Sequence, residues 1–546
     1  MPPSALAAES PFDTDTSPAA EELRAGQAHY AGGRIEPAIE AFRRGLAART
    51  ASSATATIAE LHAKLGNAHM LRGELDLAGE NYKAALRIAP HLCACWCNLG
   101  TVHLKTGKAN DAIALYFEAL KLNPAHWPSR SNLAEALIAT RQHLLAKALL
   151  TELAEERPQD GQVRHRLGRA CFELNEIEAA LEHFKQALAI NAQDAESPYW
   201  IGGISQKLGQ LDAAQAAYAR AAGIQPLIRR AASKSPADFR ALALYAPFAG
   251  NTPADYLFKD AAYDTDTLAL IAGSEPDLIP LGGIDLVVNL ISDADQAEAV
   301  LPAAARLVAK LGKPVVNDPG KISRTTRDAV AALLPGIPGC RIPKILRLDA
   351  GADVSVAALE SLLPFPFPVL ARPAGTHGGD DFEKIEDLDA LSLFLKCRPG
   401  DDYHYVIEYV AYASPDGHFR KYRFIFVGHE ILPYHLAIGN DWKVHHASTD
   451  MANQPWMQRE EAAFLADPAA VFAPANYAAL RAVRERIGLD YFGIDCALDD
   501  RGDVLVFEVN ASMLVHDDNA EFSYKDPAVR AIKSAFDAML RARAGA

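Results

Sequence analysis

A period of 34 residues constrains the fold of this chain more than any other feature. The period is carried by the aligned pairs Leu65-Gly66, Leu99-Gly100, Leu133-Ala134, Leu167-Gly168 and Ile201-Gly202. Thirteen residues after each Leu or Ile stands an alanine, and four residues further on stands a large apolar residue: Tyr82, Tyr116, Leu150, Phe184 or Tyr218. A fixed period of this length predicts stacked helix pairs, each of which buries its apolar face only against its neighbours.

Small residues such as Gly66 and Ala78 let two antiparallel helices approach closely, and Tyr82 fills the seam to the next pair. The pattern resembles the tetratricopeptide repeat, with about six copies over residues 19–228. The fourth copy departs from it, because Arg141 stands where most copies carry glycine. The resemblance implies an all-α solenoid whose concave groove binds a peptide or protein partner.

Length and charge limit the remaining possibilities. A chain of 546 residues is too long for one core. A net charge of −15 argues against a general nucleic-acid or anionic-membrane surface. Because no run of 18 apolar residues occurs, we expect no membrane span. Residues 1–18 read as a disordered leader, and seven scattered cysteines fit a reducing cytoplasm.

After Pro226 the pattern changes to apolar strands alternating with helices. Short apolar runs at 240–246, 284–291 and 313–317 have strand character, and a helical segment at 296–311 separates two of them. This alternation predicts a small parallel sheet covered on both faces, within residues 232–338. Further strands are predicted at 366–373, 403–410 and 420–428, and a final helix at 526–543.

Two apolar strands at 491–499 and 503–510 predict a hairpin whose turn centres near Arg501. Glu508 and Asn510 then share one face, and Asp495 lies opposite Glu508 at roughly 5 Å. Two carboxylates this close repel each other unless a cation or a proton lies between them. Mg²⁺ suits such oxygen ligands, because it takes one or two carboxylates and keeps phosphates as its other ligands. The alternative is a solvated hairpin face, which we expect for the turn acids Asp499, Asp500 and Asp503.

The motif Asp495…Glu508-Val509-Asn510 and the glycine-rich segment 375–379 resemble the ATP-grasp superfamily, nearest to glutathione-synthetase-like ligases. The resemblance covers residues 340–546, and 232–338 resembles the α/β domain that precedes it. It implies a multidomain protein: an all-α solenoid, an α/β pre-ATP-grasp domain and an α+β ATP-grasp domain. It also implies ATP and two Mg²⁺ ions, with Mn²⁺ as an alternative, held by Asp495, Glu508 and Asn510.

The resemblance also assigns nucleotide contacts. The glycine-rich loop would cover the phosphates through backbone N–H groups, with His377 at its tip either bonded to the γ-phosphate or solvated. Relatives carry a lysine before this loop, where this chain has Arg372. Glu408 would begin the hinge beside adenine. The full set of expected nucleotide-binding residues is Lys344, Arg372, Gly375, His377, Gly378, Gly379, Lys384, Glu408 and Val410.

Arg423 matches the arginine of an Asp-x-Arg motif, and the resemblance implies that Arg423 and Arg372 stabilise developing charge. Lys421 occupies the position of the acid, which changes the acceptor pocket. The alternative for this basic strip is an edge strand protected by charge. The donor-rich segment 440–448 adds Lys443, His445 and His446, which would bind a substrate carboxylate or the transferring phosphate or else face solvent.

The reaction implied is an ATP-dependent joining of a carboxylate to an amine or related nucleophile through an acylphosphate. The repeats suggest that the acceptor or a recruiter is a peptide or protein. Two alternatives stay open: a scaffold that only senses nucleotide, and an ATP-grasp kinase that phosphorylates a small molecule.

Overall fold

The computed structural model describes residues 15–50, 54–247, 254–273, 279, 281–349, 351–374, 382–397, 403–444, 449–517 and 519–546. The chain divides into two compact units, Met1–Ile224 and Gln225–Ala546. Most of the leader expected at 1–18 lies outside the described residues, and helix α1 begins at Pro18. Within the described ranges, no helix has both the length and the apolar character needed to span a bilayer.

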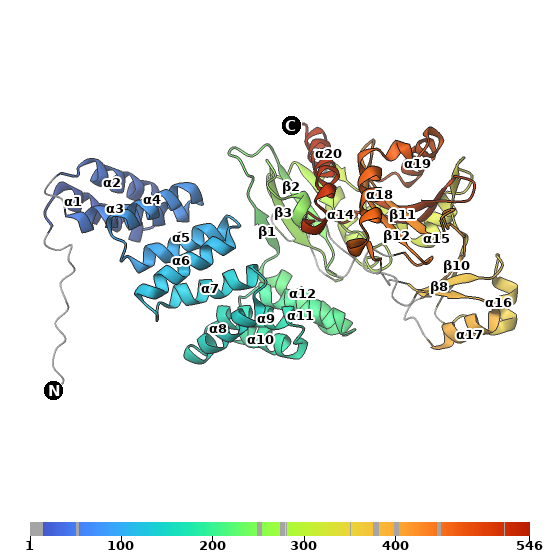
Figure 1. The fold of residues 1–546 in the computed structure, drawn as a ribbon, viewed down its shortest axis with the longest axis horizontal. Coiled ribbons are helices and arrows are strands. Elements are labelled where there is room, and N and C mark those ends of the chain that lie inside the picture. Colours follow the sequence, from blue (N-terminus) through green and yellow to red (C-terminus); the bar gives the residue numbers. More distant parts are fainter. Residues whose placement is uncertain are drawn as a thin grey trace. The chain divides into compact units, whose positions relative to one another are not determined.

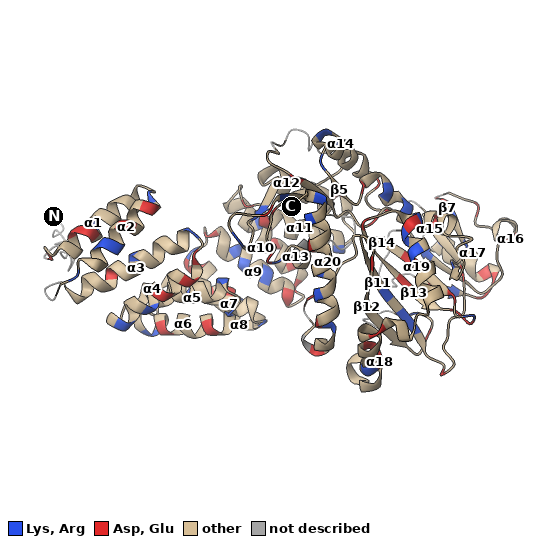
Figure 2. Ribbon diagram, turned by 90° about the horizontal axis from the view of Figure 1, so that it is seen from above, with Lys and Arg blue, Asp and Glu red and all other residues tan. Residues whose placement is uncertain are grey.

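The first unit is a row of helix pairs in which each helix packs against the next (Figure 1). The described helices are α1 (Pro18–Ala31), α2 (Ile35–Ala47), α3 (Thr55–Leu71), α4 (Leu75–Ile88), α5 (Cys93–Lys105), α6 (Ala109–Leu122), α7 (Trp127–Ala139), α8 (His143–Glu156), α9 (Gly161–Glu173), α10 (Ile177–Ile190), α11 (Glu196–Lys207) and α12 (Leu211–Ile224). Both basic and acidic residues are scattered over these helices (Figure 2).

The turn inside most pairs contains a glycine in the left-handed region, such as Gly73 with φ 75° and Gly107 with φ 77°. This conformation is strained for residues with a Cβ. In the fourth and fifth pairs Arg141 and Asn175 adopt it instead, each with φ 59°. The departure of Arg141 from the repeat pattern therefore leaves the turn geometry intact and places the strain on a side-chain-bearing residue.

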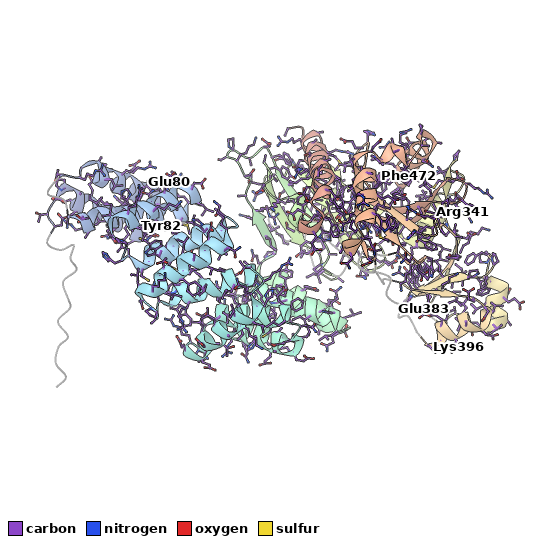
Figure 3. All side chains as sticks on the ribbon, viewed as in Figure 1. Glu80, Tyr82, Arg341, Glu383, Lys396 and Phe472 are labelled. Carbon is purple, nitrogen blue, oxygen red and sulfur yellow. The ribbon has the colours of Figure 1, made fainter. Side chains whose placement is uncertain are left out.

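The seam between paired helices is as close as the spacing predicts. Tyr82, labelled in Figure 3, is 1% exposed, and a Cβ added at Gly66 would lie 2.7 Å from its ring. Gly100 faces Tyr116 in the same way. Glycine is needed here because the ring of the following helix occupies the space of a side chain.

The second unit begins with a sheet of order β1-β3-β2-β4-β5, in which β3, β2, β4 and β5 are parallel and β1 is antiparallel at the edge. The strands are β1 (Leu227–Arg230), β2 (Arg240–Tyr245), β3 (Asp264–Ala269), β4 (Leu286–Asn289) and β5 (Val315–Val316), and the nearby helices are α13 (Ala254–Leu257), α14 (Leu301–Leu311), η2 (Pro319–Thr325) and α15 (Arg327–Leu333). Leu244 packs towards Leu307 of α14, and Ala243 packs in a separate cluster that includes Phe536. The predicted parallel sheet with two covered faces is confirmed, although its helix starts at Leu301 and not at residue 296.

A second, antiparallel sheet has the order β7-β10-β8-β9. Its elements are β7 (Ile345–Asp349), α16 (Val356–Leu362), β8 (Val369–Pro373), β9 (Glu383–Ile385), α17 (Leu388–Cys397) and β10 (Tyr403–Glu408).

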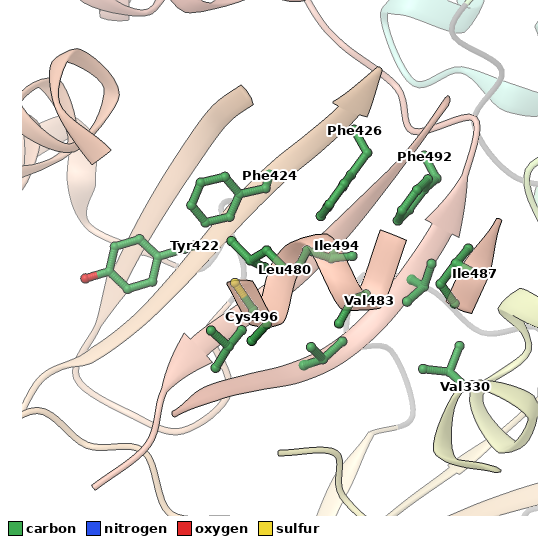
Figure 4. Close-up of a cluster of buried hydrophobic side chains, with 14 of the residues drawn as sticks. Val330, Tyr422, Phe424, Phe426, Leu480, Val483, Ile487, Phe492, Ile494 and Cys496 are labelled. Atoms are coloured by element: carbon green, nitrogen blue, oxygen red, sulfur yellow. The ribbon is translucent and has the colours of Figure 1, made fainter. Parts of the chain in front are cut away.

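The third sheet has the order β12-β11-β13-β14-β6 and contains the predicted hairpin. Its elements are β6 (Cys340–Arg341), β11 (Phe419–Val427), β12 (Glu430–Gly439), η4 (Met451–Asn453), α18 (Pro455–Ala466), η5 (Pro468–Ala470), α19 (Pro474–Ile487), β13 (Tyr491–Leu498), β14 (Val504–Ala511), η6 (Ala520–Lys525) and α20 (Asp526–Ala544). One face buries aromatic residues such as Phe424, Phe426 and Phe492 in the cluster of Figure 4.

The opposite face of this sheet is only partly covered. Ile425 and Val427 of β11 pack in the cluster that contains Phe536 of α20. Lys421 and Arg423 share their face, because side chains two residues apart on a strand point the same way. Both line a cavity. The sheet therefore presents charged side chains where its apolar covering ends.

Candidate functional site

The cavity has a volume of about 740 Å³ and lies within the second unit. Its floor includes a row of directly opposed residues across four antiparallel strands: His435 of β12, Arg423 of β11, Asp495 of β13 and Glu508 of β14. Opposed residues in such strands project from the same face. The predicted pairing of Asp495 with Glu508 is confirmed by the strand register.

Asp495 is 1% exposed and fully engaged with cations. Its oxygens accept from Arg423 Nε at 2.5 Å and Nη2 at 2.9 Å, and Lys421 Nζ lies at 3.0 Å. Burial by itself would raise the pKa of this carboxyl, but Arg423 and Lys421 outweigh burial and hold the pKa well below its usual range. Asp495 is therefore ionised at neutral pH.

Glu508 faces a cation that no sequence motif singles out. Its Oε2 accepts from Arg327 Nη2 at 2.9 Å, and its Oε1 accepts from Asn510 Nδ2 at 3.0 Å. Burial favours a raised pKa, but Arg327 offsets it and the pKa of Glu508 is lowered. Arg327 begins α15, 181 residues before Glu508 in the chain. Only the tertiary fold brings the two together.

Asp495, Glu508 and Asn510 suit a hard divalent cation. Asp495 Oδ1 and both Glu508 oxygens accept one hydrogen bond each and keep further acceptor capacity, whereas Asp495 Oδ2 contacts both Arg423 Nη2 and Lys421 Nζ. Two ionised carboxylates and an amide oxygen fit Mg²⁺ that keeps phosphate oxygens as its other ligands. To bind such an ion, Asp495 and Glu508 would exchange part of their contact with Arg423, Lys421 and Arg327.

Of the residues predicted to bind nucleotide, Arg372, Glu408 and Val410 line the cavity. Arg372 is 5% exposed and lies over the Phe382 ring; burial and the neighbouring Arg327 lower its pKa to about 10. Among the described lining residues, Lys344 and Lys384 are not found.

The side chain of Lys344 is exposed, and its backbone N–H donates a hydrogen bond to Glu408 Oε2 at 3.0 Å. Lys384 Nζ lies 4.3 Å from the centroid of the Tyr409 ring. Both lysines thus lie beside the 408–410 segment.

Several predicted residues lie outside the described ranges: Gly375, His377, Gly378, Gly379, His445 and His446. Lys443 is described and lines the cavity, where its Nζ donates to the backbone oxygen of Phe382 at 3.2 Å.

The expectation that Asp499 is a solvated surface acid is wrong. Asp499 is buried, and its Oδ1 accepts from the backbone N–H groups of Arg501 at 3.0 Å and Asp503 at 2.9 Å. Its carboxylate thus closes the hairpin turn, a local role that aspartate commonly has in turns. Asp500 is exposed as expected.

A second charged group borders the cavity and was not predicted. Glu461 of α18 is fully buried, and its oxygens contact His435 Nδ1 at 2.5 Å, Tyr524 OH at 2.6 Å and Lys525 Nζ at 3.1 Å. Its Oε1 also accepts from the backbone N–H of Leu436 at 3.1 Å. Glu461 therefore satisfies an edge-strand donor as well as the side chains around it.

Comparison with known proteins identifies the first unit. Family models of the tetratricopeptide repeat match residues 23–92, 103–167 and 195–226, and a TPR model matches 168–209. Residues 23–226 thus consist of tetratricopeptide repeats, a class of repeat that implies a protein or peptide partner. These matches end at residue 226, so the assignment of the second unit to a family stays a prediction.

Three solved structures illustrate the likeness. MamA of Desulfovibrio magneticus RS-1 is 18% identical and matches over 31% of this chain and 94% of its own, with a TM-score of 0.29. PilF of Pseudomonas aeruginosa is 18% identical over 38% and 92%, with a TM-score of 0.33. YrrB, described as a TPR protein with an unusual peptide-binding site, is 20% identical over 30% and 86%, with a TM-score of 0.26. A comparison with curated protein sequences finds no match.

Proposed function

We propose that the protein is an ATP- and Mg²⁺-dependent ligase that joins a carboxylate to an amine or related nucleophile through an acylphosphate. In this proposal residues 340–546 form an ATP-grasp domain and the repeats recruit a peptide or protein partner. The observation that carries it is the cavity in which Asp495, Glu508 and Asn510 face Arg327, Arg372 and Arg423. Acids for a metal ion and cations for phosphate are thus gathered around one cavity.

Each group has a role that follows from its chemistry. The segment Glu408–Val410 forms part of the cavity wall where the base of ATP would bind. Asp495, Glu508 and Asn510 would hold Mg²⁺, which when bound supplies charge neutralisation of the phosphates. Because Arg423, Lys421 and Arg327 already keep the carboxylates ionised, the acids need release no proton to bind a cation. The same cations then stabilise charge on the transferring phosphoryl group.

The first unit offers a surface for a partner along the first helices of its repeats. Polar side chains link neighbouring repeats there: Asn98 Nδ2 donates to Asn67 Oδ1 at 2.9 Å, and Arg166 Nη1 donates to Ser131 Oγ at 2.6 Å. Arg169 Nη1 lies 2.8 Å from Glu135 Oε1. Such amides and guanidinium groups can bind the backbone and carboxylates of an extended peptide.

Calorimetric titration of Mg·ATP into the full-length protein tests the nucleotide site. Glu508→Gln should weaken binding at least about tenfold, since it removes a charge from the metal ligand set. Asp500→Asn on the same hairpin removes an exposed charge and should leave the affinity unchanged. Equal affinity in the wild-type protein and Glu508→Gln would refute the site.

A scaffold that only senses nucleotide is a second candidate, favoured by the cations that already hold both oxygens of Asp495. ADP release and mass spectrometry of conjugates, with Mg·ATP and a cell extract, separate the possibilities. A ligase forms a product that joins two molecules, a kinase forms a phosphorylated one, and a scaffold forms neither.

Recruitment is tested in the same assay with a protein fraction as the acceptor source. Arg169→Ala should reduce conjugate formation, whereas Lys121→Ala, on the second helix of another repeat, should not. Equal yields from both variants would refute a role for this surface.

A further inference from the structure

A histidine with one free ring nitrogen faces the cavity. The Nε2 atom of His435 is buried and has no hydrogen-bond partner among the described residues, and His435 lines the cavity. Its other nitrogen, Nδ1, contacts Glu461 Oε1 at 2.5 Å. A buried polar atom without a partner costs free energy, so a ligand atom at Nε2 would account for it.

The surroundings determine which nitrogen carries the proton. Glu461 is ionised, since His435 and Lys525 outweigh the effect of burial and lower its pKa to about 2. A contact between Nδ1 and a carboxylate oxygen therefore needs a proton on Nδ1. Lys525 Nζ lies 3.1 Å from Nδ1 but has only donors to offer, so it cannot replace Glu461 as the acceptor. In the neutral ring Nε2 thus holds a lone pair that no described residue uses.

The position of His435 relates this lone pair to the proposed chemistry. His435 is directly opposite Arg423, which is directly opposite Asp495. Two strand spacings place the backbone of His435 about 10 Å from that of Asp495. Side chains that project from one sheet face at this separation can contact two substrates bound side by side in the cavity.

We propose that His435 is the proton acceptor for the attacking amine of the second substrate, and that Glu461 is its positioning residue. This inference rests on the proposed ligase function and assigns the class of acceptor, a primary amine. As the amine nitrogen forms its bond to the acyl carbon, the bond from that carbon to the phosphate oxygen breaks and the electron pair leaves with phosphate. The amine arrives as an ammonium ion, and Nε2 of His435 accepts its first proton so that the nitrogen has a lone pair for the attack; the second proton leaves with the departing phosphate after the nitrogen has bonded.

The charges around the ring are consistent with a base. Burial lowers the pKa of His435, and Lys525 and Arg423 act in the same direction, whereas Glu461 acts against them. His435 is therefore neutral at pH 7 and able to accept a proton. Tyr524 is hydrogen-bonded to the other oxygen of Glu461 and fixes the carboxylate that orients the ring.

Nuclear magnetic resonance of the full-length protein labelled with ¹⁵N-histidine tests the ring directly. The signals missing from His435→Gln identify this residue. We expect a neutral ring at pH 7.5 with the proton on Nδ1, and protonation only below pH 6.5. A proton on Nε2 at pH 7.5 would overturn the inference whether or not the protein is a ligase.

A turnover assay tests the role. The protein is supplied with Mg·ATP and a small-molecule cell extract, with or without hydroxylamine, a nucleophile that is neutral near pH 7 and attacks an acylphosphate without first losing a proton. In His435→Gln the ratio of amide product to hydroxamate should fall about 100-fold. His418→Gln is the matched control, because His418 pairs with Asp416 in the same unit and lies outside the cavity lining.

The outcomes separate the two proposals. If the wild-type protein forms neither hydroxamate nor amide, the proposed ligase function fails. If hydroxamate forms and the ratio in His435→Gln equals that of the wild-type protein, the ligase stands and His435 is not the proton acceptor. A fall in the ratio that His418→Gln does not share supports both.

Discussion

Adding one methyl group at Gly100 should destabilise the third repeat, because the space is already occupied. A Cβ at this position would lie 2.7 Å from Tyr116 Cε1, 2.9 Å from Cδ1 and 3.1 Å from Cζ. Tyr116 is fully buried, so its ring has little room to move. The fourth repeat shows how the chain accommodates a methyl group here, since Ala134 replaces the glycine and Leu150 replaces the aromatic residue.

The change in the free energy of unfolding caused by Gly100→Ala is the sum of two opposing effects. Overpacking a core costs about 1–3 kcal/mol, and replacing a helical glycine with alanine gains about 1 kcal/mol. Gly100→Ala should therefore cost between about zero and 2 kcal/mol in the free energy of unfolding. Tyr116→Leu alone should cost about 2–4 kcal/mol through the cavity it leaves. The double variant should cost about 1–2 kcal/mol less than the sum, because leucine removes the clash.

Hydrogen exchange of the amides of α6, measured by mass spectrometry in the full-length protein, reports this local stability without requiring both units to unfold together. Gly79→Ala is the control: its Cβ would lie 3.5 Å from Val102 Cγ1, so it gains helix propensity without a clash. Additive effects of Gly100→Ala and Tyr116→Leu, within about 0.5 kcal/mol, would refute the packing argument.

Three further substitutions test other features. Arg141→Gly should stabilise the fourth repeat by about 1 kcal/mol, because glycine adopts the left-handed backbone without strain. Hydrogen exchange in this repeat should then be slower than in the wild-type protein, and faster exchange would contradict the prediction. Glu461→Ala should cost about 3–5 kcal/mol, since it leaves the largely buried Lys525 ammonium without its carboxylate partner. It should also speed amide exchange at Leu436, whose N–H donates to Glu461; unchanged exchange would count against it. The pKa of His435 is lowered from 6.5 in the folded state, so the unfolded chain binds the proton more readily. The contribution of His435 to the free energy of unfolding is therefore fully present above pH 6.5 and decreases at lower pH. Scanning calorimetry of His435→Gln should lose this part of the slope, and an identical slope would argue against a buried neutral ring.

The helical solenoid was predictable because its information is local and repeated. Each repeat carries the same small and large residues at the same spacing, and one seam predicts the others. The hairpin of Asp495 and Glu508 was predictable for a similar reason: a short turn fixes the register, so two residues on neighbouring strands must face each other.

Strand β3 shows where sequence patterns stop being informative. No strand is predicted at its Asp-Thr-Asp-Thr segment, which lacks an apolar run, yet Asp266 is buried in an interior strand and pairs with Arg240 at 2.9 Å. A cation on the neighbouring strand compensates the charge, and the pattern within β3 holds no record of that partner.

The linear order of residues thus determined the repeat architecture, the parallel sheet and the pairing of two acids across a hairpin, since each depends on neighbours within a few dozen positions. Only the tertiary structure decided that Arg327 reaches Glu508 and that Glu461 orients His435. The first contact spans 181 residues, and the second joins a strand to a helix 26 residues further on. The free energy that selects both comes from burying and compensating charge in a cavity that exists only after the sheets have packed.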